Sequence, residues 1–197
     1  MIYVVPSLKA KEKLQCEGKA WAESQGFTYV PRGKRTIQDL MDEYGEDFLV
    51  YSSRGPQIDR PEGSHFFSLN MAELRIQNLR KGQRDHLLEA LMGRGSSKLP
   101  ITVLDCTCGF GADAAVASFG LPTGSRVDAL EVSPLLEAVT SWGFSHFVHK
   151  KDDVTAALRR ISLRHGDYRD YLLSDEGPVY DVLYFDPMFQ RPVEASC

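Results

Sequence analysis

The chain has 197 residues, of which 43% are apolar and 25% are charged. This composition is typical of a soluble globular protein and excludes disordered and fibrous classes. No uncharged stretch reaches the roughly 18 residues of a membrane span, and the apolar start is too short for a signal peptide, so we expect a cytoplasmic protein with reduced cysteines. The net charge is −4, with +2 on residues 1–100 and −6 on the remainder, which permits a nucleic-acid contact in the N-terminal part.

The N-terminal part is predicted to open with a β-α-β unit followed by a further helix and strand. The expected strands are 2–5, 27–30 and 48–51, and the expected helices are 8–24 and 37–44, the latter with Thr36 as N-cap and Gly45 as its end. Residues 52–64 hold two prolines and two glycines, which indicates a loop. We therefore expect an N-terminal α/β subdomain over 1–64, with a possible substrate or RNA contact, and a second domain over 65–197.

The second part has a different pattern. A short strand over 65–69 and a helix over 71–92, with Gly82 as a possible break, precede the linker 93–97. Buried strands, each followed by a helix, are then expected at 101–105, 126–131, 161–165 and 180–185. Strands that alternate with helices predict an α/β fold with a parallel, doubly wound sheet.

A glycine pair marks the junction between the first of these strands and its helix. Gly109 and Gly111 follow Asp105 and Thr107, and Glu131 ends the next strand, 20 residues after Gly111. Glycines let a ligand approach the backbone closely, and an acid at this spacing can accept hydrogen bonds from both ribose hydroxyls. An ordinary tight turn with a solvent-facing glutamate is the alternative interpretation.

The same passage favours S-adenosylmethionine (SAM) over a dinucleotide. The third glycine of the dinucleotide fingerprint is missing, and Asp105 would repel a phosphate but attract the cationic amino-acid part of SAM. The passage resembles the first motif of class I SAM-dependent methyltransferases, with Thr107 in place of a frequent glycine. The resemblance implies cofactor contacts from Asp105, Thr107, Gly109, Gly111 and Asp113.

Two residues after the third strand are further cofactor candidates. In methyltransferases of this class an acid at this place accepts a hydrogen bond from the adenine amino group, which makes Asp167 a candidate, and Tyr168 could cover the adenine ring. A common Gly-Asp turn is the alternative. Because ligands bind at the carboxyl edge of an open α/β sheet, we expect this edge to be the functional site.

The fourth strand ends in Asp186, Pro187, Met188 and Phe189, in the position of the Asp/Asn-Pro-Pro-Tyr/Phe motif of amino-methyltransferases. Asp186 and the Pro187 carbonyl can accept an amine N–H, and Phe189 can stack on an extruded base. Asp186, Pro187 and Phe189 are therefore the catalytic candidates. A turn cap with a core aromatic is the alternative.

Residues 105–114, 130–134 and 184–189 together resemble the SAM-dependent methyltransferases related to the bacterial small-subunit rRNA guanine-N2 methyltransferase. The resemblance covers 70–190, and the N-terminal part resembles an uncharacterised Gram-positive branch of that group. It implies a Rossmann-like class I methyltransferase sheet, SAM as cofactor, and methylation of an exocyclic amino group of a nucleobase, with guanine in rRNA favoured.

Other interpretations stay open. Only 11 residues follow Asp186, so we expect a sheet truncated after its fourth strand. The alternatives are a non-catalytic SAM- or RNA-binding module and an NAD-dependent dehydrogenase. Basic clusters at 31–35 and 80–84 are candidate RNA contacts, with a solvated surface as the simpler explanation. The five histidines show no metal-ligand spacing, and no metal is expected.

Overall fold

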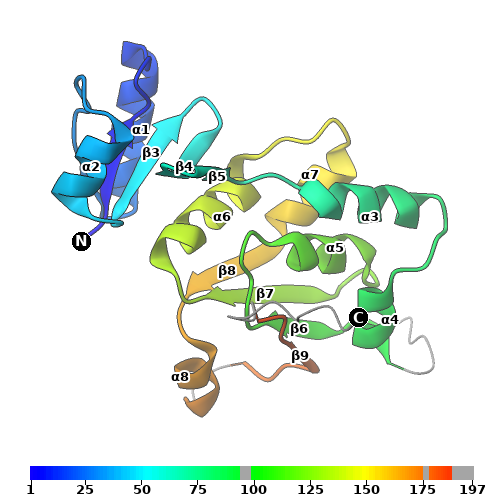
Figure 1. Ribbon diagram of the computed structural model, residues 1–197. Helices are drawn as coiled ribbons and strands as arrows, with labels where there is room; N and C mark the ends of the chain where they lie inside the picture. The colour runs from blue at the N-terminus through cyan, green and yellow to red at the C-terminus, as the bar shows by residue number, and fades with distance from the viewer. Residues whose placement is uncertain (94–98, 175–177, 188–197) are drawn as a thin grey trace, which may run out of the picture.

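The computed structural model describes residues 1–93, 99–174 and 178–187, which form two β-sheets with helices packed against them (Figure 1). The first sheet has five strands in the order β2-β1-β3-β4-β5, and the second has four in the order β8-β7-β6-β9. The chain completes the first sheet before it enters the second. The architecture is therefore α/β, as predicted.

The N-terminal sheet is mixed, because β1 pairs in parallel with β2 and β3, whereas β4 pairs antiparallel with β3 and β5. Its elements are β1 (Tyr3–Pro6), α1 (Glu12–Ser24), β2 (Thr28–Tyr29), α2 (Ile37–Tyr44), β3 (Phe48–Ser52), β4 (Gly55–Arg60) and β5 (Gly63–Phe66). The predicted β-α-β opening and the following helix and strand are confirmed. The N-cap of α2 is also confirmed: Thr36 and Asp39 form a reciprocal capping box.

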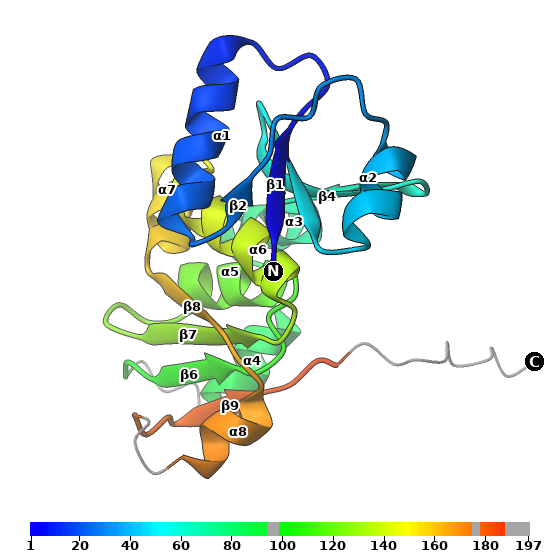
Figure 2. The same ribbon diagram turned by 90° about the vertical axis from the view of Figure 1, so that its left-hand side faces the viewer.

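Alternation along the central strands places apolar side chains on both faces of this sheet. Val4 and Leu49 pack on the α1 side, whereas Val5, Phe48 and Val50 pack on the α2 side. Successive residues of a strand point to opposite faces, so two helices cover one sheet (Figure 2). The N-terminal part is a three-layer α/β unit.

The expectation of a loop over 52–64 is wrong, because β4 and β5 form a hairpin there. Pro56 lies at the start of β4, where it pairs with Tyr51 of β3 alone, and Pro61 lies in the turn between the two strands. Neither proline is paired with strands on both sides, so neither has to donate a backbone N–H to a central strand ladder. The prolines therefore do not prevent strand formation. The expected domain boundary at 64/65 falls inside β5.

The second sheet is parallel throughout, with β6 in contact with β7 and β9, and β7 in contact with β8. Its strands are β6 (Thr102–Asp105), β7 (Arg126–Glu131), β8 (Ile161–His165) and β9 (Val182–Tyr184), and the helices are α3 (Asn70–Arg80), α4 (His86–Met92), α5 (Ala112–Gly120), α6 (Pro134–His146), α7 (Asp152–Arg159) and α8 (Tyr168–Leu173). All four predicted strands are confirmed, and so is the break at Gly82. In the described part of the chain β9 is the edge strand.

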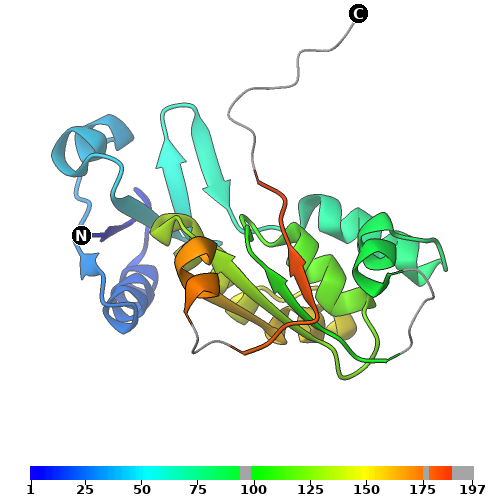
Figure 3. The same ribbon diagram turned by 90° about the horizontal axis from the view of Figure 1, so that it is seen from below.

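The two faces of the parallel sheet are covered unequally. Helices α5, α6 and α7 pack on one face, whereas α8 lies on the other (Figures 1 and 3). Under α8 a small cluster joins Leu104, Cys106 and Leu130 to three tyrosines. The face below the sheet is therefore the more open one among the described elements.

The two sheets share one core. Phe67 follows β5 and packs edge-to-face on Phe144 and Phe147, at centroid distances of 5.6 Å each. A Cβ on Gly143 would lie 1.9 Å from the Phe67 ring, so this helix position needs glycine. One cluster of buried residues runs from Val4 to Ile161 across both sheets. In the described ranges no helix combines the length and the apolar character needed to cross a membrane.

Candidate functional site at the carboxyl edge of the parallel sheet

The loop between β6 and α5 has the conformation that its glycines permit. Gly109 and Gly111 adopt φ values of +57° and +76°, which favour glycine. A Cβ on Gly111 would lie 2.2 Å from the Phe144 ring, whereas a Cβ on Gly109 would meet nothing within 4 Å. Gly111 therefore lets the loop pack on α6, and Gly109 leaves open space beside the backbone.

Glu131 fixes this loop. Its carboxylate accepts the Gly109 N–H at 2.9 Å and the Ser133 N–H at 2.8 Å, and the side chain is buried. The Thr140 hydroxyl donates to the Gly109 carbonyl at 2.9 Å. Each carboxylate oxygen of Glu131 keeps a second acceptor site, so the two loop hydrogen bonds leave it able to accept further hydrogen bonds, and its ribose role stays a prediction.

Asp105 lies buried at the end of β6 and accepts the Thr107 N–H at 3.0 Å. Burial, followed by the charges of Asp113, Glu131 and Asp186, raises the pKa of Asp105 to about 7, and the Thr107 hydrogen bond only partly opposes this. Low dielectric and neighbouring negative charges both penalise the ionised acid. A ligand that brings a positive charge would relieve that penalty.

Thr107 connects the cofactor loop to the candidate catalytic motif. Its hydroxyl accepts the backbone N–H of Asp186 at 2.8 Å. A glycine, which is frequent at this place in the resembling motif, has no group to do so. The hydroxyl thus holds the end of β9 against the loop and leaves the exposed Asp186 carboxylate without a hydrogen bond among the described residues.

We expect Thr107→Val to lower the rate of methyl transfer about fivefold, because it removes the acceptor for Asp186 and keeps the side-chain shape. S-adenosylhomocysteine affinity should stay within about twofold. Steady-state rates at saturating SAM measure the first effect, and Thr107→Ser, which keeps the hydroxyl, is the matched control. Equal rates for the valine and serine variants would contradict this positioning role.

Asp113 has a structural network that the sequence did not reveal. Arg75 of α3 binds Asp85 through two N–H groups, at 2.8 and 2.9 Å, and Asp113 at 2.5 Å. The Tyr184 hydroxyl donates to the other Asp113 oxygen at 2.8 Å. The Arg75 guanidinium also lowers the pKa of Asp85. This network connects α3, α4, α5 and β9, so Asp113 stabilises the packing of the elements around the site. The predicted contact of Asp113 with the cofactor stays a prediction.

We expect Arg75→Met to destabilise the protein by about 2 kcal/mol, because two carboxylates lose the cation between them. Urea unfolding followed by circular dichroism measures this. The double variant Arg75→Met/Asp113→Asn should recover part of the loss, since it removes one of the two charges. A double variant less stable than Arg75→Met would argue against the network.

The predicted adenine site has a different local role. Asp167 caps α8 through the Arg169 N–H at 2.8 Å and pairs with the Arg169 side chain, which lowers the pKa of Asp167. Tyr168 packs edge-to-face on Phe185 at 5.0 Å and contacts the cluster under α8. Both lie after β8 as expected, and their contacts with the cofactor stay a prediction.

The catalytic candidates lie at the end of the described chain. Asp186 and Pro187 are exposed at the carboxyl end of β9. Phe189, together with Met188, lies outside the described residues, so its predicted stacking role stays a prediction.

A positively charged ligand fits this edge better than an anion. Asp105, Glu131 and Asp186 converge here, and in the described ranges none of the three has a cation within ion-pair distance. Glu131 offers acceptors, and the loop at Gly109 offers open space. Asp105 suits the ammonium of SAM and Glu131 suits its ribose, whereas the three acids together oppose a pyrophosphate.

The arginines of the two predicted RNA clusters are engaged within the protein. Arg35 binds Glu43, Tyr44 and backbone oxygens, and the buried Arg32 donates to the Arg35 carbonyl. Arg80 pairs with Asp153, and Arg84 pairs with Glu89. Among the residues that the structure describes, no group of three or more His, Cys, Asp or Glu side chains could hold a metal ion.

The chain is similar to known proteins over most of its length. Residues 63–196 match the family model described as "Putative SAM-dependent methyltransferase". The protein named "Uncharacterized protein YpiP" from Bacillus subtilis is 28% identical over 195 residues, which is 98% of this chain and 74% of that protein.

Several relatives carry a functional name. Proteins named ribosomal RNA small subunit methyltransferase J, from Marinobacter nauticus and Dechloromonas aromatica, are each 28% identical, over 76% and 80% of this chain. The chain spans 50% and 61% of their lengths. The crystal structure of the SAM-dependent methyltransferase NGO1261 from Neisseria gonorrhoeae aligns with a TM-score of 0.63 at 18% identity, over 95% of this chain and 70% of that one, which shows the shared fold.

Proposed function

Because this chain belongs to the SAM-dependent methyltransferase family, we propose that it binds SAM at the carboxyl edge of β6 and β7 and methylates an exocyclic amino group of a nucleobase. One observation carries this proposal: an acidic edge, which has no balancing cation among the described residues, is tied through Thr107 to the Asp186-Pro187 end of β9. This contact supports a cofactor site that lies beside the amine-binding motif.

The role of each residue is inferred from its contacts. Asp105 and its acidic neighbours attract the positive charges of the cofactor, and Glu131 accepts hydrogen bonds from its ribose. When bound, SAM supplies a methyl group that its sulfonium already activates. The protein therefore has to orient a weakly nucleophilic amine rather than create a strong base.

Asp186 and the Pro187 carbonyl orient that amine. The Asp186 backbone is fixed by Thr107, and the carboxylate faces solvent, so it can accept an N–H of the amine. An amine methylated by bound SAM would lose a proton, with S-adenosylhomocysteine as the leaving product, and the exposed Asp186 carboxylate would pass that proton to water.

The acceptor proposed is guanine in ribosomal RNA. The names of the relatives support ribosomal RNA, and the Asp-Pro motif after β9 supports an exocyclic amine such as that of guanine. Incubation with methyl-tritiated SAM and undermethylated small-subunit rRNA is expected to place the label in a methylguanine nucleoside after digestion.

The outcomes separate the alternatives. An unlabelled rRNA, with S-adenosylhomocysteine still bound, would contradict the proposed acceptor and favour the non-catalytic module. Binding of NADH without S-adenosylhomocysteine would contradict the methyltransferase proposal itself.

A further inference from the structure

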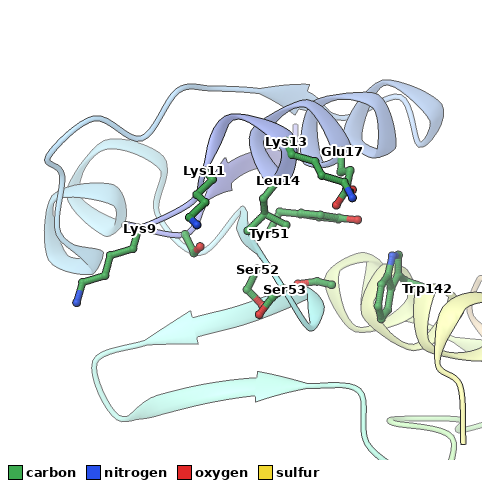
Figure 4. A pocket seen from close by; sticks show the side chains of 11 residues that line it. Lys9, Lys11, Lys13, Leu14, Glu17, Tyr51, Ser52, Ser53 and Trp142 are labelled. Atoms are coloured by element: carbon green, nitrogen blue, oxygen red, sulfur yellow. Dashed lines mark hydrogen bonds and ion pairs between the residues drawn. The ribbon is translucent and has the colours of Figure 1, made fainter.

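A second concave region lies away from the carboxyl edge. A hollow of about 580 Å³ opens between the start of α1, the β3–β4 turn and the end of α6 (Figure 4). A neighbouring hollow of about 620 Å³ shares Glu17, Tyr51 and Trp142 with it. We call the two together the α1–α6 cleft. None of the residues proposed for the cofactor or the acceptor amine lines it.

Positive charge gathers on one wall of the cleft. Lys9 and Lys11 line it from the segment that leads into α1, and Lys13 lines it from the first turn of α1; the Lys9 ammonium points outward, away from Tyr51 and Trp142 (Figure 4). In the described ranges Lys9 and Lys11 have no ion-pair partner, and Lys13 lies 3.9 Å from Glu17 with its side chain 90% exposed. Exposed pairs of this kind are weak. These ammonium groups are therefore available to an anion, unlike the guanidinium groups of Arg32 and Arg35 in the first predicted RNA cluster.

The opposite wall presents stacked rings. The Trp142 indole lies against Gly55, where a Cβ would come within 2.5 Å of the ring. Tyr51 of β3 lines the same hollows as Trp142, and burial raises the pKa of Tyr51. His146 stacks on Trp142 at a centroid distance of 5.0 Å and 7° between planes, and it is exposed. The stack thus ends in a ring that a planar partner can reach.

We propose that the α1–α6 cleft binds a single-stranded segment of the RNA substrate, with phosphates on Lys9, Lys11 and Lys13 and a base against His146. Proteins commonly bind single-stranded nucleic acids with cationic groups for the phosphates and aromatic rings for the bases. An acidic protein partner would use the lysines but has no bases to stack on the rings. The inference rests on the proposed function, because it assigns a second binding site for the same RNA substrate.

The β4–β5 hairpin relates this cleft to the cofactor loop. Gly55 lines the cleft at the start of β4, and Ile58, three residues further, pairs with His65 of β5. His65 stacks on Phe110 of the cofactor loop at 6.3 Å. Three strand residues span about 10 Å. One RNA strand of a few nucleotides can therefore reach from the cleft toward the loop.

The test compares two double charge reversals. Lys9→Glu/Lys11→Glu is expected to weaken binding of a fluorescein-labelled single-stranded rRNA oligonucleotide at least tenfold in anisotropy titrations. It should also reduce the slope of log Kd against log salt by about 1.4, the value for two lost phosphate contacts. Lys19→Glu/Lys150→Glu, which makes the same charge change outside the cleft, should stay within about twofold of wild type.

Two further measurements separate the RNA-binding proposal from the proposed function. Calorimetry with S-adenosylhomocysteine should give the same affinity for wild type and both double variants. If wild type does not bind S-adenosylhomocysteine, the proposed function is contradicted rather than the RNA-binding role of the cleft. In a Trp21→Phe background, Trp142 is the one remaining tryptophan of the chain, and its emission should change along the RNA titration. Equal losses in both double variants, absent RNA binding, or RNA binding with constant Trp142 emission would each overturn the cleft.

Discussion

Replacement of Asp186 by alanine is expected to lower the rate of methyl transfer at least 100-fold, while S-adenosylhomocysteine affinity stays within about twofold. The carboxylate is exposed, and none of the described residues occupies it, so it is available to position the acceptor amine. Loss of one preorganised polar contact to the reacting group has effects of this size. Single-turnover rates with tritiated SAM measure the loss.

Asp186→Asn is the matched control for this experiment. The amide keeps an acceptor oxygen and the backbone N–H that Thr107 holds, so it should retain at least ten times the activity of Asp186→Ala. If alanine is as active as wild type, Asp186 does not position the amine.

The second large effect is a dependence of protein stability on pH that arises from Asp105. Its pKa is about 7 in the folded protein, against an ordinary value of 3.8. Because the folded pKa is the higher one, the folded state binds the proton more tightly. The associated stabilisation is complete below pH 4 and is lost as the pH rises through 7, at about 4 kcal/mol in total.

Asp105→Asn cannot titrate, yet its amide oxygen can still accept the Thr107 N–H. The difference in unfolding free energy between this variant and wild type should therefore grow by about 4 kcal/mol in favour of the variant between pH 4 and pH 8. Urea unfolding at four pH values measures it. A constant difference across that range would show that Asp105 has an ordinary pKa.

The strands of the parallel sheet could be predicted because each is short, holds apolar residues such as Val103, Val127 and Leu163, and is separated from the next strand by a helical segment. That local signal placed Asp105 and Glu131 at one edge, since parallel strands end together. The hairpin over β4 and β5 escaped prediction, because Pro56 and Pro61 carry a loop signal even where the ladder does not need their N–H groups.

The rest of the site depends on contacts between distant segments. Arg75 is 38 residues from Asp113, and Tyr184 is 71 residues from it, so no local pattern could assign Asp113 to this network. The partners of Arg80 and Arg35 likewise become visible only in the fold. The lysine wall of the α1–α6 cleft is spread over alternate residues and forms no unbroken basic run.

The central claim is that the carboxyl edge of β6 and β7 binds the methyl donor, and calorimetric titration with S-adenosylhomocysteine tests it most directly. We predict one site per chain, weakened at least tenfold by Glu131→Ala, because two ribose hydrogen bonds and the clamp on Gly109 are lost. Glu137→Gln, a neighbouring change on α6, should leave the affinity within about twofold. Absence of binding, or equal affinity in wild type and Glu131→Ala, would contradict the account.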